Sequence, residues 1–255
     1  MRRPSARPAG RTSRSRSSGL RHGLGPITRL NVAPGVAAHS RAYAVLKEAV
    51  LAGKFRPGEV VTLRSLAKQL AITEMPIREA LRRLTSEGAF EALPNRSARV
   101  PRLTRRQVEQ ILELRQELEG KAAALAARNI TLVQIEHLTA LQQAMEKALG
   151  SGDTRAFMSL NMAFHFEIYQ IADNPVLIPL IQMLWLRMAP LVASTMQLLS
   201  ARAAVVRRIG LENHERLLAA LQIRDPVAAR DAMYADLLGL TKLPGYWDLV
   251  DQMFG

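Results

Sequence analysis

Apolar and polar residues follow different patterns along the chain and divide it into three stretches. Residues 1–37 show no apolar periodicity and predict no helix or strand. From Ser40 onwards apolar residues recur every three or four positions, which is the period of one face of an α-helix. From Thr104 to about residue 240 this pattern continues without a strand or a repeat. The chain is therefore predicted to be mostly α-helical.

The middle stretch predicts three short helices followed by a small hairpin. Thr62 can cap the second helix, and the third covers about residues 74–87. Two short extended segments follow, at 89–93 and 98–101, with turn-forming residues between them. This order is typical of a winged helix-turn-helix, which we expect at residues 38–102.

The last stretch predicts an all-helical bundle. Six helices are expected, at residues 104–128, 132–149, 154–172, 175–199, 202–223 and 226–240. They place the bundle at residues 103–245 and leave a C-terminal tail at 246–255. The most apolar segment, 176–199, is interrupted by proline and arginine, so we expect a buried bundle helix there and no membrane span.

Charge separates these stretches further. The net charge is +13, and residues 1–30 contribute eight arginines and no acid. Residues 31–102 hold 12 basic and 6 acidic residues, whereas residues 103–255 hold 15 basic and 16 acidic ones. This asymmetry indicates a polyanion-binding module joined to another domain. The absence of cysteine excludes disulfides, thiolate zinc sites and cysteine nucleophiles, and indicates an intracellular protein.

Residues 1–37 are rich in Arg, Ser, Pro and Gly, which predicts a disordered basic arm. A secretory signal would need an apolar run after the arginines, and residues 12–18 are polar instead. Several interpretations remain: a dispensable tail, an arm that grips DNA, a transit peptide, or a true start codon further downstream.

The third predicted helix has an exposed polar face suited to DNA. A helix can enter the major groove, where its N-terminal side chains meet the base edges. Each arginine alone would be an ordinary solvated residue, but the order of elements and the basic charge favour contact with double-stranded DNA. The predicted DNA contacts are Arg64, Thr73, Glu74, Arg78, Arg82, Arg96 and Arg99.

A second set of polar residues lies on the apolar stripes of the helical half. Asn161 and His165 are four residues apart and share a helix face, while His214, Asp236 and Arg115 each align with leucines, alanines or isoleucine on their own helices. A buried charge is costly unless it is paired or bound to a metal. Their convergence would create a site inside the bundle, in which the planar fork of Arg115 suits a carboxylate.

Two motifs resemble the DNA-binding domain of GntR-type bacterial transcription regulators. They are Leu63-Arg64-Ser65-Leu66-Ala67 and Pro76-Ile77-Arg78-Glu79-Ala80-Leu81-Arg82-Arg83-Leu84, supported by residues 55–59 and 95–100. The helical remainder resembles the FadR-like branch, whose effector module is called the FCD domain. The resemblance implies a cytoplasmic, nucleoid-associated and ligand-responsive homodimer, which we expect to be a repressor bound to a short palindromic operator.

The resemblance also assigns residues. Arg64, Thr73 and Arg78 occupy positions that contact DNA in the family. Glu74 stands where the family usually has arginine. Because a carboxylate can accept a hydrogen bond from cytosine but repels phosphate, we expect an operator that differs from the family's common one.

Family members commonly hold a divalent metal with one aspartate and three histidines. Here Asn161 falls at the aspartate position, His165 and His214 at two histidine positions, and Asp236 where the last histidine is expected. Two imidazoles, a carboxylate and an amide oxygen suit zinc, nickel, iron or manganese. The alternative is a metal-free pocket in which Arg115, Asn161, His165 and His214 bind an organic acid directly.

Two other classes of function fit the sequence less well than a transcription regulator does. A metal-dependent enzyme on a helical bundle would leave the basic module unexplained, and the sequence has no nucleophile–base pair or HExxH spacing. An architectural DNA-binding protein would need no effector, and the polar residues on apolar stripes argue against it. We therefore expect a regulator without enzymatic activity.

Overall fold

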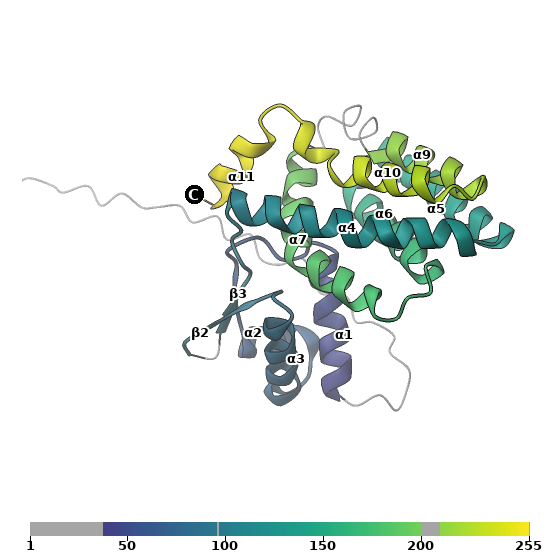
Figure 1. Ribbon diagram of the computed structural model, residues 1–255. Coiled ribbons are helices and arrows are strands. Elements are labelled where there is room, and N and C mark those ends of the chain that lie inside the picture. The colour runs from purple at the N-terminus through teal and green to yellow at the C-terminus, as the bar shows by residue number, and fades with distance from the viewer. Residues whose placement is uncertain (1–37, 96, 200–209, 255) are drawn as a thin grey trace, which may run out of the picture.

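The structure of the chain is a computed structural model and describes three ranges: residues 38–95, 97–199 and 210–254. The predicted arm at 1–37, Arg96, and residues 200–209 of the predicted helix 202–223 lie outside these ranges. Figure 1 shows a small domain with a β-sheet beneath a larger bundle of helices. The predicted fold class, a winged helix-turn-helix followed by an all-α bundle, is confirmed.

The small domain contains three helices and three strands. In chain order they are α1 (Ala38–Leu51), β1 (Val60–Thr62), α2 (Leu63–Leu70), α3 (Glu74–Ser86), β2 (Glu91–Leu93) and β3 (Ser97–Arg99). The strands form an antiparallel sheet in the order β1-β3-β2. The sequence does not predict β1, because three residues are too few to show alternation. This strand forms where Val61 pairs with Ala98 of β3.

Local sequence explains the bounds of α2 and the orientation of α3. The Thr62 hydroxyl accepts a hydrogen bond from the Ser65 amide, and the Ser65 hydroxyl accepts one from the Thr62 amide, so the predicted cap is confirmed. α2 ends at Ala71, whose φ of 54° is left-handed. The residues that α3 buries are those that its period predicts: Ile77, Ala80, Leu81 and Leu84.

The larger domain is helical in its described residues. Its elements are α4 (Arg105–Asn129), α5 (Leu132–Gly150), α6 (Thr154–Ile171), α7 (Leu177–Leu199), α9 (Glu212–Gln222), α10 (Pro226–Leu237), the short 3-10 helix η3 (Leu240–Lys242) and α11 (Tyr246–Phe254). Four helices begin at side chains that accept amide hydrogen bonds, which are Thr104, Thr131, Asp153 and Asp225. These caps explain why most helix starts agree with the sequence prediction within two residues.

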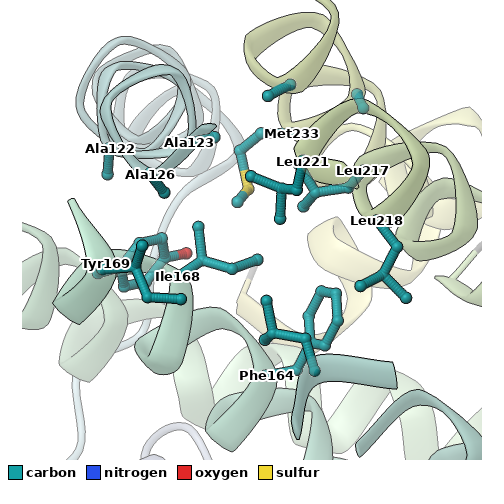
Figure 2. Close-up of a cluster of buried hydrophobic side chains, with 14 of the residues drawn as sticks. Ala122, Ala123, Ala126, Phe164, Ile168, Tyr169, Leu217, Leu218, Leu221 and Met233 are labelled. Carbon is teal, nitrogen blue, oxygen red and sulfur yellow. The ribbon is translucent and has the colours of Figure 1, made fainter. Parts of the chain in front are cut away.

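Small residues of α4 lie at the centre of the bundle. Ala122, Ala123 and Ala126 are fully buried beside the apolar side chains of α6, α9 and α10 (Figure 2). A Cβ atom at Gly120 would lie only 2.2 Å from the Tyr234 ring, so α10 runs close along α4. This packing joins α4, α6, α9 and α10, the helices that carry the predicted polar site.

The C-terminal segment corrects one prediction. Residues 246–255 are expected to form a tail, but α11 packs on α4 through Tyr246 and Val250, which are buried. Their apolar partners include Val108 and Leu112. The segment is helical because this contact removes its apolar residues from water, a gain that a nine-residue helix alone would not have.

Helix α7 lies between the bundle and the small domain, with α1 directly beneath it (Figure 1). By length and composition, Leu177–Leu198 could cross a membrane, but half of this segment is buried inside the protein. Leu186 belongs to the core of the small domain, whereas the adjacent Trp185 belongs to the core of the bundle. The helix is apolar because it is packed on two sides.

Candidate functional site

The N-terminal end of α3 carries three of the predicted DNA contacts. Thr73 is the residue before α3, is exposed, and makes no side-chain capping bond, so its hydroxyl is available to a ligand. Glu74 is half-buried at the first position of α3, and Arg78 is exposed one turn later. A groove of about 350 Å³ between α3 and the sheet is lined by residues that include Arg78 and Arg82. Arg64 is exposed on α2.

Two of the predicted arginines already have acidic partners. Arg82 Nη2 lies 3.2 Å from Glu79 Oε2 on α3. Arg99 Nη2 lies 2.9 Å from Glu91 Oε2, and these residues are directly paired between β2 and β3. Exposed pairs of this kind contribute only about 0–1 kcal/mol. Phosphate groups can therefore replace either glutamate.

Met75 is a surface residue of α3 that the sequence prediction missed. Its side chain is 59% exposed, beside Glu74 in the first turn of the helix. Apolar side chains contact the methyl group of thymine in the major groove. The helical period could have identified Met75, because it places this residue on the outward face.

Inside the bundle the structure brings three predicted ligands together. His165 of α6 and His214 of α9 are buried, and Asp236 of α10 lies beside them. His165 Nε2 is 3.2 Å from Asp236 Oδ2, His214 Nε2 is 3.5 Å from Asp236 Oδ1, and the two Nε2 atoms are 3.3 Å apart. The three ligand atoms all lie within 4.8 Å of one another, which is close enough to share one ion.

Arg115 and Glu119 form a buried pair on α4 next to this cluster. Arg115 Nε donates to Glu119 Oε1 at 2.6 Å, and the guanidinium stacks 4.8 Å above the Trp185 ring. Glu119 also accepts hydrogen bonds from Tyr169 Oη and Trp185 Nε1. Arg115 Nη2 also donates to Glu119 Oε2, at 3.4 Å. The charge of Arg115 is therefore neutralised and its side chain is held in one orientation, while its remaining N–H groups can bind a ligand.

Burial and neighbouring charges shift the pKa values of these groups. Burial alone would lower the pKa of Arg115, but Glu119 outweighs burial and raises it. Burial, together with the charge of Glu119, raises the pKa of Tyr169 well above its usual value. Burial alone would raise the pKa of Asp236, but His214 and His165 hold it well below its usual range. Arg115 and Asp236 are therefore charged, while Tyr169 keeps its proton.

The hydrogen-bond network assigns the tautomers of both histidines. Tyr169 donates its proton to Glu119, so its oxygen accepts from His165 Nδ1, 3.3 Å away. Gln142 Nε2 donates to a backbone carbonyl, which turns its Oε1 towards His214 Nδ1 at 3.2 Å. Each Nδ1 is then a donor, so Nε2 is the ring nitrogen that faces Asp236 in both histidines. Nε2 donates to the carboxylate when it carries a proton, and this interaction lowers the pKa of Asp236. Without that proton, each Nε2 offers a lone pair, and the two rings with the carboxylate could hold one cation.

A cavity of about 100 Å³ adjoins this cluster. Its polar lining consists of Arg115, Asn161, His165 and Asp236. The rest is mostly apolar and comes from α1, α6, α7 and the C-terminal end of α10, including Leu51, Phe157, Met158 and Val192. The structure therefore places all but one of the predicted ligand-binding residues on one cavity; His214 lies behind it.

Several site residues were not predicted. Glu119 and Tyr169 could have been found, because each lies four residues after a predicted one, Arg115 and His165. Gln142 and Trp185 lie on other helices, and no spacing in the sequence connects them to the site.

Comparison with known proteins matches both domains. The FCD domain family matches residues 110–238, and the family described as bacterial regulatory proteins, gntR family, matches residues 38–100. The HTH-type transcriptional regulator McbR of Escherichia coli (strain K12) is 34% identical over 188 residues, which cover 74% of this chain and 84% of McbR. The gluconate operon transcriptional repressor of Bacillus subtilis (strain 168) is 24% identical over 185 residues, or 71% and 74% of the two chains.

A solved structure agrees with the sequence relatives. E. coli McbR/YncC aligns with a TM-score of 0.76 and 29% identity, covering 86% of this chain and 100% of that one. The domain order, the fold and the exposed basic face of α3 are thus those of a DNA-binding regulator, and the relatives are regulators, not enzymes. The chain belongs to the GntR family of bacterial transcriptional regulators, in the FadR-like branch whose second domain is an FCD domain.

Proposed function

We propose that this regulator is a cytoplasmic, nucleoid-associated repressor that binds a short palindromic operator as a homodimer and is released by a small organic acid. In this proposal residues 38–102 bind DNA, and residues 103–245 bind the effector and form the dimer. α11 packs on α4 and therefore joins the second domain. The observation that carries the proposal is a cavity in the bundle that is lined by Arg115 together with His165 and Asp236 of the cluster.

The DNA contacts divide by position. Thr73, Glu74 and Arg78 lie at the end of α3 that would enter the major groove, so we assign them to base edges. The other predicted arginines are assigned to phosphates: Arg64, Arg82, Arg96 and Arg99. Phosphate contacts position the protein, while base contacts select the sequence.

The residues of the cluster fit a divalent metal. Two imidazole Nε2 atoms and one carboxylate face one another, and Asn161, whose amide oxygen is a possible ligand, lines the adjoining cavity. We assign His165, His214, Asp236 and Asn161 to zinc, nickel, iron or manganese. When bound, such an ion supplies a positive charge that can hold an effector carboxylate.

Charge supports this assignment. With neutral imidazoles, Arg115 contributes one positive charge, and Glu119 and Asp236 contribute one negative charge each, so the site is negative overall. A divalent ion makes it positive overall. An anionic effector is therefore expected to bind more tightly to the metal-loaded protein, with Arg115 and the metal as its two partners.

The proposal is tested by selecting DNA from a random pool with the full chain. Organic acids are then screened by thermal shift, since binding to the native state raises the melting temperature. An acid that stabilises the zinc-loaded protein should also lower operator affinity. Arg115→Lys keeps the charge beside Glu119 but loses the planar fork, so it should weaken this response. If no sequence is enriched, or no acid changes the affinity, the proposal is wrong.

The dimer is tested separately by sedimentation of the full chain. A palindrome requires two-fold symmetry, and basic DNA-binding domains repel each other, so we expect the helical domains to make the contact. The expected mass is twice the chain's 28.2 kDa. A monomer at the concentration that saturates the operator would contradict the proposed dimer.

A further inference from the structure

The cavity of the helical domain is lined in part by the DNA-binding domain. Leu51, the last residue of α1, is among its lining residues, together with Met188, Ala189 and Val192 of α7. Leu51 also packs against the apolar cores of both domains. A ligand in this cavity can therefore touch the DNA-binding domain without an intermediary.

Helix α7 of the helical domain in turn reaches into the DNA-binding domain. Trp185 lines the cavity, and the next residue, Leu186, is buried in the core of the DNA-binding domain. The Arg187 side chain passes so close to Gly88 that a Cβ atom there would lie 3.2 Å from Arg187 Cδ. Gly88 lies two residues beyond the end of α3. Three consecutive residues of α7 thus connect the cavity, the DNA-binding core and the end of the recognition helix.

The contact between α1 and α7 leaves little free space. Gly53 follows α1 with a φ of +64°, and a Cβ atom there would lie 2.0 Å from Ala193 Cβ. Lys47 Nζ donates a hydrogen bond to Gln182 Oε1 at 2.8 Å on the same face of α7. Because α1 and α3 share one buried core, a displacement of α1 relative to α7 carries α3 with it.

We propose that Leu51 is part of the effector site and that the apolar end of the effector displaces it, which moves α1 and α3 away from the DNA-binding arrangement. This inference rests on the proposed function and adds the regulation of that site. A ligand shifts an equilibrium only if it interacts differently with the two states, and direct contact with Leu51 provides such a difference. Arg115 and the cluster hold the polar end of the effector, and Leu51 meets the apolar end.

The size of the cavity limits the effector. Its volume of about 100 Å³ is smaller than the ~150 Å³ apolar cavity known to hold benzene. A ligand with a carboxylate and a compact apolar group therefore fits only if it displaces side chains that line the cavity. Acids too short to reach Leu51 should bind without changing operator affinity, which makes Leu51 a specificity determinant.

The absence of cysteine from the chain allows a test that needs no effector. Leu51→Cys introduces a single thiol, and its thiolate attacks an alkyl methanethiosulfonate to form a disulfide and release methanesulfinate. The methyl adduct has about the size of leucine, whereas the benzyl adduct fills the cavity. We expect the benzyl adduct to bind the selected operator roughly 5- to 150-fold more weakly than the methyl adduct, the usual range of allosteric coupling.

Glu48→Cys is the matched control, because Glu48 lies three residues earlier on the exposed side of α1. Its benzyl and methyl adducts should bind the operator equally. Equal affinity of the two Leu51→Cys adducts, with circular dichroism showing both folded, would overturn the inference. A benzyl adduct that weakens operator binding while no organic acid does so would support the role of Leu51 and reject the proposed effector class.

Leu51→Ala provides an independent test if the benzyl adduct unfolds the protein. An acid from the thermal-shift screen should still bind this variant, but saturating acid should no longer lower operator affinity. Met158→Ala shortens a cavity residue on α6, and should weaken acid binding while keeping the full response at saturation. An undiminished response of Leu51→Ala would overturn the inference.

Discussion

The two domains use charged residues in opposite ways. On α3, Arg78 and Arg82 are exposed, and the acidic partner of Arg82 is also in water. In the bundle, Arg115 and Glu119 are buried and tied to Tyr169 and Trp185.

Exposure to solvent decides how much each ion pair contributes to stability. An exposed pair contributes about 0–1 kcal/mol, whereas removing one partner of a buried pair costs about 3–5 kcal/mol. The DNA-binding face can therefore exchange its partners for phosphate at little cost, while the buried pair keeps a fixed geometry.

The sharpest test of this contrast removes one buried charge. Glu119→Gln leaves the Arg115 guanidinium in the core without its counter-charge, so we expect the free energy of unfolding to fall by about 3–5 kcal/mol. Urea denaturation measures it. Glu109→Gln breaks the exposed pair with Arg105 on the same helix and should cost no more than about 1 kcal/mol. Similar losses in both variants would show that burial does not separate the two pairs.

The next largest effect concerns the metal. His214→Ala removes a proposed ligand. Gln142→Ala removes only the group that orients this histidine, which should weaken metal binding by about 10- to 100-fold. We expect the first variant to lose more metal than the second. Elemental analysis after dialysis against zinc measures this. His137 is half-exposed and pairs with Glu167, so His137→Ala should keep all its metal. Unchanged metal content in His214→Ala would contradict the assignment.

On the DNA-binding face the expected effect is smaller and depends on sequence. Arg78→Ala should weaken binding to the selected operator by about 1–3 kcal/mol, as expected for a contact to a base. Fluorescence anisotropy with operator and random DNA measures the difference. Arg82→Ala should weaken both equally and reduce the salt slope by about one. If Arg78→Ala also weakens both equally, Arg78 contacts phosphate only.

The smallest effect comes from a pair that competes with DNA. Glu91→Gln frees Arg99 from its cross-strand partner, so binding to random DNA should strengthen by up to about 1 kcal/mol, with a salt slope steeper by about 0.9. Titrations at several salt concentrations measure both quantities. Glu113→Gln makes the same charge change on an exposed residue of α4 and should alter neither. A response equal to that control would show that Arg99 does not reach DNA.

Periodicity and caps were sufficient to predict most of the fold. α3 buries the residues that its spacing indicates, and the cap at Thr62 lies where the sequence places it. These features depend on neighbours within four residues, so they can be read from the chain directly. β1 and α11 could not be predicted, because each is stabilised by a distant partner, β3 for one and α4 for the other.

The candidate sites also combine features that local sequence determines with features that depend on distant partners. The sequence by itself determined which side chains point outward from α3 and which polar residues sit on apolar stripes, since helical geometry fixes both. Only the tertiary structure decided that Glu119 accepts a hydrogen bond from Trp185, that Gln142 reaches His214, and that Leu51 lines the cavity. These contacts join residues on different helices or in different domains, and their distances depend on packing that local spacing does not encode.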